Sequence, residues 1–166
     1  MLSIAKILAD VQLILLCGHN STLQVQLESL DTQAKHVVMG FTSDIELYMR
    51  LGDFLIGKPG PGSLSEAVQL GLPVITFNNR MTMPQERYNA VWVREQGVGL
   101  VVPSPRVIRA AVMKMIQNLP DYRAAVKRID NRALFEVIDI FEQLLNPTPP
   151  HRDADCLAGI SSSLTA

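Results

Sequence analysis

The chain has 166 residues, a length that allows one domain with a hydrophobic core and is short for two ordinary domains. Hydrophobic residues make up 48% and charged residues 19%, which excludes a largely disordered chain, and a net charge of −1 without a lysine and arginine cluster argues against nucleic-acid binding. The two cysteines, Cys17 and Cys156, have neither metal-site nor disulfide spacing, so we expect a reducing compartment.

The first residues show no targeting signal. Lys6 and Asp10 interrupt any signal-peptide core, and the apolar stretch Val11 to Cys17 is far shorter than a bilayer span. The predicted location is therefore the cytoplasm, including the peripheral surface of a membrane. Leu2 to Ala9 is predicted to form a helix with no strand before it, whereas an α/β domain normally opens with a strand and a glycine-containing turn. We expect that first unit to be missing.

Short runs typical of strands alternate with helical patterns along the chain. The predicted strands are Gln12 to Cys17, His36 to Met39, Asp53 to Ile56, Val74 to Phe77 and Val98 to Val102. The predicted helices are Thr22 to Leu30, Asp44 to Leu51, Leu64 to Leu70, Gln85 to Gln96 and Arg106 to Leu119. This alternation predicts an α/β fold in which helices cover both faces of a parallel sheet.

The end of the chain divides into a helix and a tail. Asn131 to Leu145 is predicted to be a helix with apolar residues on one side, which packs either on the domain or against another one. The sequence from 147 to 166 is rich in proline, serine and polar residues and predicts a disordered tail. We therefore expect one domain over residues 1–146.

The segment Phe54 to Phe77 is the most informative part of the chain. It reads FLIGKPGPGSLSEAVQLGLPVITF, a strand, a loop, a helix and a second strand. The loop residues Gly60, Pro61 and Gly62 allow a ligand to approach the backbone closely. The helix that follows begins with unpaired N–H groups and a positive dipole end, which suit an anionic or polyhydroxyl ligand.

Ser63 and Glu66 allow two interpretations. Ser-x-x-Glu at a helix start is a capping box, in which each side chain bonds the backbone N–H of the other residue. Alternatively, Glu66 lies one turn inside the helix at the sheet edge, where its carboxylate can accept two hydrogen bonds from a vicinal diol such as a ribose. The neighbouring glycines favour the second interpretation.

A second polar group opens a later helix. Pro84 suits the first turn, so Gln85, Glu86 and Asn89 lie near the helix start on adjoining positions. Their side chains are suited to hydrogen-bonding sugar hydroxyls. The alternative is a polar stripe that faces solvent.

One more loop after a strand completes the candidate site. The loop that contains Phe41 and Thr42 joins a strand to a helix and can offer backbone groups to a flat heterocycle, although alone it is an ordinary connection. His19 lies in a similar loop without partner spacing, so we interpret it as a loop residue rather than a catalyst. His36, at a strand start, is interpreted as structural.

Together these motifs resemble one family. KPGPGSLSEAVQLGLPVI, followed by MPQERYNAVWVREQGVGLVV, is similar to the donor-binding, C-terminal half of the two-domain Rossmann-type glycosyltransferases, and is most like the monogalactosyldiacylglycerol synthases and the lipid II N-acetylglucosaminyltransferase. The resemblance runs from about Val11 to Val102. It implies a three-layer Rossmann-like fold and a UDP-sugar donor, with no further cofactor and no metal.

The resemblance also implies residue roles. The loop from Gly60 to Ser63 and Glu66 would hold the ribose, Gln85, Glu86 and Asn89 would bind the sugar, and the backbone at Phe41 and Thr42 would contact uracil. No catalytic residue is expected, because the family's acceptor domain supplies the presumed base. The implied activity is transfer of galactose, glucose or N-acetylglucosamine to a lipid acceptor, with the acceptor domain on a partner chain or an absent segment. The alternatives are a UDP-sugar epimerase-like domain, a non-catalytic fragment, and the donor subunit of a split transferase.

Overall fold

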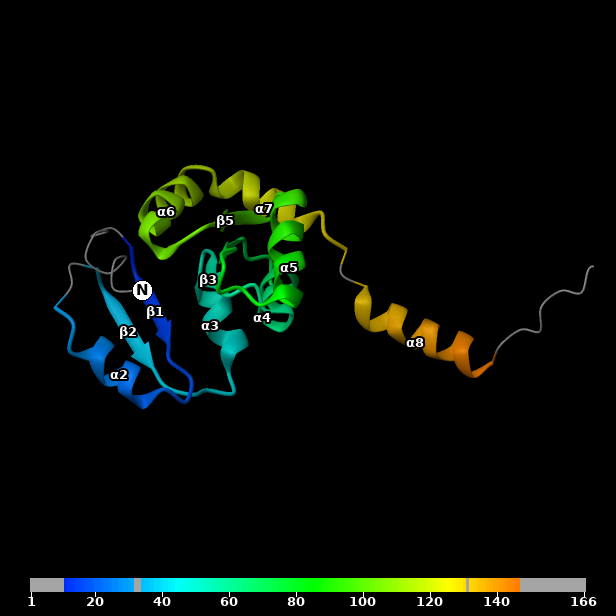
Figure 1. The fold of residues 1–166 in the computed structure, drawn as a ribbon, viewed down its shortest axis with the longest axis horizontal. Helices are drawn as coiled ribbons and strands as arrows, with labels where there is room; N and C mark the ends of the chain where they lie inside the picture. The colour runs from blue at the N-terminus through cyan, green and yellow to red at the C-terminus, as the bar shows by residue number, and fades with distance from the viewer. Residues whose placement is uncertain (1–10, 32–33, 131, 147–166) are drawn as a thin grey trace, which may run out of the picture. The chain divides into compact units, whose positions relative to one another are not determined.

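The computed structural model describes residues 11–31, 34–130 and 132–146. The chain divides into two compact units, residues 1–130 and residues 131–166. The described elements of the first unit follow one another as β1 (Leu13–Leu16), α2 (Ser21–Glu28), β2 (His36–Met39), α3 (Ile45–Leu51), β3 (Leu55–Gly57), α4 (Pro61–Gln69), β4 (Val74–Phe77), α5 (Pro84–Glu95), β5 (Gly99–Val102), η1 (Pro105–Val107), α6 (Ile108–Gln117) and α7 (Leu119–Lys127) (Figure 1). The predicted helix Leu2 to Ala9 and the predicted tail lie outside the described residues.

Every strand pair in the first unit is parallel, which confirms the predicted α/β class. The strands form two sheets rather than a single one. β1 pairs with β2 (Figure 1). β3, β4 and β5 form the other sheet, in that order. The sheets are linked by side chains, since Val11 and Leu13 pack against the core formed by β4, β5 and α6.

The three-stranded sheet is covered on both faces, as predicted. Residues of a strand point alternately to opposite faces, and Val74 and Ile75 of β4 accordingly belong to different apolar clusters. Val74 packs with residues from α3, α4, α5 and α7, whereas Ile75 packs with α6. Both side chains are fully buried. This sheet therefore forms the middle layer of three.

Two helices end in glycine turns that lead into strands. Gly71 has φ +76°, and the next residue, Leu72, donates its N–H to the Ala67 carbonyl at 2.8 Å. Gly97 has φ +66°, and Val98 donates to the Val93 carbonyl at 3.2 Å. These bonds define Schellman caps, which need a residue that tolerates positive φ. They end α4 and α5 sharply, so β4 and β5 can begin at once.

The region after β5 differs from the prediction. The helix predicted from Arg106 to Leu119 is divided into η1 and α6, and a further helix, α7, follows directly. Pro120 lies in the first turn of α7. A proline is accepted there because its missing N–H has no helical partner at that position. Ala125 and Val126 of α7 are buried in the core, so this helix is part of the first unit.

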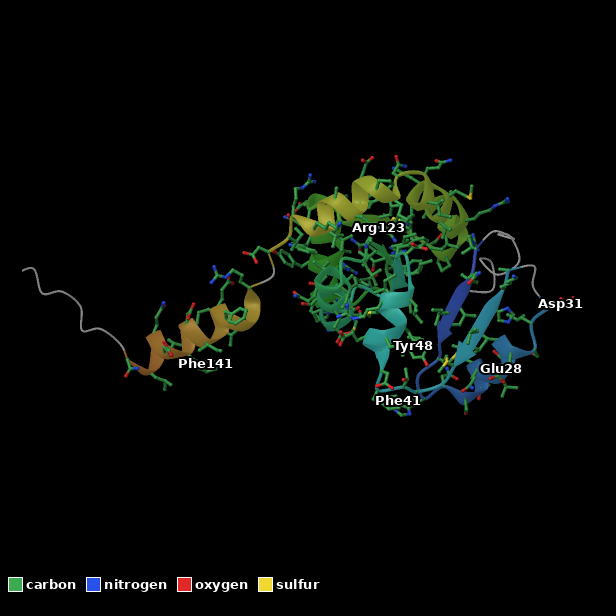
Figure 2. All side chains as sticks on the ribbon, turned by 180° about the vertical axis from the view of Figure 1, so that it is seen from behind. Glu28, Asp31, Phe41, Tyr48, Arg123 and Phe141 are labelled. Atoms are coloured by element: carbon green, nitrogen blue, oxygen red, sulfur yellow. The ribbon has the colours of Figure 1, made fainter. Side chains whose placement is uncertain are left out.

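The second unit contains α8, Ala133–Leu145, within the helix predicted at 131–145. Its described apolar side chains are exposed, as the labelled Phe141 illustrates (Figure 2). They are Phe135, Val137, Ile138, Ile140, Phe141, Leu144 and Leu145. The unit boundary after residue 130 precedes the expected domain end at 146, and the assignment of α8 to the domain stays a prediction. Within the described ranges, no helix is long and apolar enough to cross a membrane.

Candidate functional site

The loop between β3 and α4 presents a helix start to solvent. Gly60 is the N-cap with extended backbone, and Pro61 and Gly62 occupy the first turn. Ser63 lies inside the helix, where its hydroxyl donates to the Gly60 carbonyl at 3.3 Å. The N-cap is Gly60 rather than Ser63, so the capping-box interpretation of Ser63 and Glu66 is wrong. Helix α4 begins at Pro61, before the predicted start at Leu64, because the fixed φ of proline favours the first helical position.

The start of α5 lies against this loop. The Asn89 side-chain amide donates to the Pro59 carbonyl at 2.8 Å. A methyl group on Gly60 would lie 3.9 Å from Glu86 Oε1 and 3.5 Å from the Ser63 hydroxyl oxygen. The structure therefore brings together two polar groups that are separated by more than twenty residues in sequence. Asn89 and Glu86 are partly buried in this contact, so the interpretation as a solvent-facing stripe does not describe them.

Gln85 occupies the exposed side of the same helix start. Its amide nitrogen lies 3.5 Å from the sulfur of Met83, the residue before the helix. This weak contact leaves the polar end of Gln85 in solvent. The side chain is thus available to a ligand, unlike that of Asn89, whose nitrogen is bonded to the loop.

The loop after β4 fixes the position of α5. Thr82 is buried, and its hydroxyl oxygen accepts from the Asn79 N–H at 3.0 Å. The Asn79 carboxamide oxygen accepts from the Met81 N–H at 2.8 Å. Arg87 reaches back from α5 to donate to the Thr82 carbonyl at 3.3 Å. These bonds hold the connection in one shape, so Gln85 and Glu86 start from a rigid base.

Glu66 is exposed and lines a cleft of about 440 Å³ between α3 and α4. Ser43, from the loop after β2, lines the same cleft, so the structure places Glu66 beside the predicted heterocycle loop. The other lining residues are Ile45, Glu46, Met49, Arg50, Gln69 and Leu70. A carboxylate at the edge of such a cleft can accept hydrogen bonds from the hydroxyl groups of an incoming ligand.

The loop after β2 holds the remaining predicted residues. The Thr42 hydroxyl oxygen accepts from the Asp44 N–H at 3.0 Å, immediately before α3 begins. Phe41 is exposed, and its ring stacks on the His19 ring. His19, interpreted from the sequence as a loop residue, thus lies beside a predicted site residue. A sequence signal for this contact exists, because His19 and Phe41 each lie just beyond the carboxyl end of a strand, and the carboxyl ends of parallel neighbouring strands lie at the same sheet edge.

The site carries both negative and positive groups. The Glu86 carboxylate lies near Gly60, the N-cap of α4, where the unpaired N–H groups and the positive dipole end of the helix are, and Lys58 is exposed on the loop before it. Glu66 lies beyond the first turn of α4 and lines the cleft toward α3. The N-terminal end of α4 favours a phosphate, whereas carboxylates favour hydroxyl groups. In the part of the chain that the structure describes, no group of three or more histidine, cysteine, aspartate or glutamate residues is placed to hold a metal ion.

Comparison with known proteins identifies a matching family. Residues 1–144 match the glycosyltransferase family 28 C-terminal domain. The chain is 31% identical over 160 residues to the probable monogalactosyldiacylglycerol synthase 3 of Oryza sativa subsp. japonica, covering 93% of this chain and 30% of that protein. It is 30% identical over 141 residues to the processive diacylglycerol beta-glucosyltransferase of Bacillus licheniformis, covering 81% of this chain and 36% of that protein.

A solved structure supports the fold. The crystal structure of WaaG, a glycosyltransferase involved in lipopolysaccharide biosynthesis, superposes with a TM-score of 0.57 at 17% identity, covering 82% of this chain and 38% of that one. The chain spans about 30% of the length of the first curated relatives. The match over residues 1–144 covers most of the sequence, and the chain therefore belongs to the family of glycosyltransferase family 28 C-terminal domains.

Proposed function

We propose that this chain binds the UDP-sugar donor of a glycosyltransferase that transfers a hexosyl group to a lipid acceptor. The proposal rests on the contact between the β3–α4 loop and the start of α5, which is made by the hydrogen bond from Asn89 to Pro59 and leaves the Glu86 carboxylate close to Gly60. Because of this contact, the N-terminal end of α4, which suits a diphosphate, lies next to side chains at the start of α5 that suit a sugar. The names of the relatives, which include galactolipid and glucolipid enzymes, support transfer of a hexosyl group to a lipid acceptor.

Each part of the donor has a candidate partner. The Glu66 carboxylate accepts from the ribose hydroxyl groups, while the N–H groups of the first turn of α4 receive the diphosphate. Gln85 and Glu86 bind the hexose, and Asn89 holds the loop beside it. The backbone at Phe41 and Thr42 receives the uracil. These roles place the donor beyond the carboxyl ends of β2, β3 and β4, where ligands of open α/β sheets bind.

The chemistry assigned to this chain is the stabilisation of the leaving group. As the bond between the anomeric carbon and the diphosphate breaks, negative charge develops on the UDP oxygen. The positive end of α4 lies where it can stabilise that charge, and fixed N–H groups do so without reorganisation. The acceptor hydroxyl and its base come from a second domain or a partner chain. The exposed apolar side chains of α8 support a partner surface.

Titration calorimetry tests the proposal. UDP, UDP-galactose, UDP-glucose and UDP-N-acetylglucosamine are titrated into the purified chain, its Glu66→Gln variant and its Glu95→Gln variant. Glu95 is the matched control, since it is also an exposed helical glutamate but lies at the far end of α5. We expect Glu66→Gln to weaken UDP binding roughly 10- to 100-fold, because a hydrogen bond to a charged group contributes about 1.5–3 kcal/mol.

The titrations distinguish failure of the proposed function from failure of the role of Glu66. Glu95→Gln should leave the affinity unchanged, and the sugar nucleotide that binds most tightly identifies the hexose. If the unaltered chain binds none of the four nucleotides, the proposed function is wrong. If it binds them and Glu66→Gln has no effect, the ribose role of Glu66 is wrong.

A further inference from the structure

The carboxyl ends of β1 and β2 are tied together where their loops begin. The two strands are in parallel register with Leu16 opposite Met39, and the Cys17 N–H donates to the Met39 carbonyl at 2.8 Å. The next residues of both strands therefore leave the sheet side by side. His19 lies three residues beyond Leu16, and Phe41 lies two residues beyond Met39. Both rings therefore follow closely on a pair of adjacent strand ends.

The two rings form a near-parallel stack. Their centroids are 4.2 Å apart and their planes differ by 13°. Despite this contact, 66% of the Phe41 side chain is exposed. One face of the phenyl ring is covered by His19, so the exposed area includes the opposite face. An aromatic ring whose one face is covered and whose other face is open is a platform for a further flat ring.

Both loops are anchored beside the stack. The Asn20 side-chain oxygen accepts from the Leu23 N–H at 2.9 Å and caps α2. The Thr42 hydroxyl oxygen accepts from the N–H of Asp44, the N-cap of α3, at 3.0 Å. The residue after His19 and the residue after Phe41 are therefore each held by a local bond. Such anchoring lowers the freedom of the platform before any ligand arrives.

We propose that His19 is a positioning residue for the nucleobase of the donor. It holds the Phe41 ring so that the open face stacks on a pyrimidine, giving the order His19, Phe41 and base. The inference rests on the proposed function, since it deepens the nucleotide site at Phe41 and Thr42. His19 touches the base only through Phe41, and its effect is to fix a ring that would otherwise rotate freely about its side-chain bonds.

A double-mutant cycle with two ligands tests the proposal. UDP and inorganic pyrophosphate are titrated into the unaltered chain, His19→Ala, Phe41→Ala and the double variant. We expect UDP affinity to fall about three- to ten-fold in His19→Ala and about ten-fold or more in Phe41→Ala. The double variant should be no weaker than Phe41→Ala, because His19 acts through Phe41. Pyrophosphate affinity should not change, since it has no base.

Two further variants test whether the effect of His19 comes from its flat ring. His19→Phe keeps a flat ring against Phe41 and should restore UDP affinity to within two-fold of the unaltered chain. His36→Ala removes a histidine at the opposite end of β2 and should not change the affinity of the folded chain for UDP. If Phe41→Ala does not fold, Phe41→Leu takes its place in the cycle. These controls separate ring positioning from a general loss of structure.

The failures are distinguishable. If UDP binds and responds to Glu66→Gln, but His19→Ala has no effect, the positioning role is overturned and the proposed function stands. Equal losses for UDP and pyrophosphate, or additive effects in the double variant, also overturn it. If the unaltered chain does not bind UDP, the proposed function fails first. Phe41 and His19 would then be interpreted as a protein contact surface.

Discussion

The Asn89 carboxamide nitrogen lies 2.8 Å from the Pro59 carbonyl oxygen, thirty residues earlier in the chain. This hydrogen bond joins the start of α5 to the loop before α4. Pro59 is buried, so its carbonyl has little access to water. The bond therefore fixes the distance between the helix end assigned to the diphosphate and the side chains assigned to the sugar.

Replacing Asn89 with alanine should weaken both stability and ligand binding. The Pro59 carbonyl would lose its donor, at a cost of about 1–3 kcal/mol in the free energy of unfolding. We expect the affinities for UDP and for UDP-sugars to fall by a similar factor, because the loop itself loses its position. Urea denaturation and calorimetry measure the two effects.

The matched control is Asn118→Ala. Asn118 donates the same type of bond at the same length, 2.8 Å, but to Lys114 in an exposed position at the end of α6. Its removal should cost less than about 0.5 kcal/mol and leave binding unchanged. If Asn89→Ala lowers only the affinity for UDP-sugars and not that for UDP, Asn89 contacts the sugar directly instead.

The contact between Asn89 and Pro59 illustrates what the sequence could not predict. Local patterns located the strands because each apolar run is bounded by turn residues, and they located most helices by their period. They did not predict how α4 and α5 pack, since that depends on the twist of the sheet and on side-chain volumes. The stack of His19 on Phe41 was missed for the same reason, because it requires the register of β1 and β2.

Two local errors have local causes. Ser63 resembled an N-cap, but Pro61 sets the helix start three residues earlier, with Gly60 as the N-cap, and leaves the Ser63 hydroxyl to bond the Gly60 carbonyl. Helix α7 was not predicted, although Pro120 is compatible with the first turn of a new helix. In both places the position of a proline in the first turn of a helix was the deciding signal.

Replacing Gly62 with alanine should raise the stability of the free chain and lower its affinity for UDP. No heavy atom lies within 4 Å of a methyl group placed on Gly62, and its φ is not positive. Gly62→Ala should therefore stabilise the free chain by about 0.4–1 kcal/mol, since alanine restricts the unfolded state. The same methyl group would occupy the approach to the first turn of α4, so UDP affinity should fall about ten-fold, or about 1.4 kcal/mol.

Thermal unfolding and calorimetry on the same samples check both signs. The stability of the ligand-free variant is the internal control, because it shows that weaker binding does not come from unfolding. An unchanged UDP affinity would mean that the ligand does not approach the backbone at Gly62.

Gly99 tests the packing that supports the site. A methyl group on Gly99 would overlap the Val74 carbonyl oxygen of the neighbouring strand, and that atom cannot move without breaking the β4–β5 pairing. We expect Gly99→Ala to lower the free energy of unfolding by at least about 3 kcal/mol, at the upper end of overpacking effects. Gly57→Ala is the control, since its methyl group would meet no atom within 4 Å. A denaturation midpoint that is equal in both variants would contradict the close approach of β5 to β4.

Tyr122 should give the chain a measurable dependence of stability on alkaline pH. The hydroxyl is partly buried against the cluster that contains α6, and burial, with a smaller contribution from the charge of Asp121, raises its pKa. In the unfolded chain a tyrosine releases its proton near pH 10, about the ordinary pKa. Above that pH the unfolded chain binds fewer protons than the folded chain, so the free energy of unfolding falls as pH rises until the folded pKa is passed.

Tyr122→Phe removes this titration while it keeps the ring in the cluster. We expect the variant and the unaltered chain to lose stability in parallel up to about pH 9.5, and the unaltered chain to lose more above it. Urea denaturation at half-unit steps from pH 8 to 11.5 measures the difference, with Tyr88→Phe as the control because Tyr88 is 73% exposed. Since all other titrating groups are common to the three proteins, a difference confined to Tyr122→Phe assigns the alkaline slope to that hydroxyl. Identical slopes in all three would mean that Tyr122 ionises as freely in the folded chain as in the unfolded one.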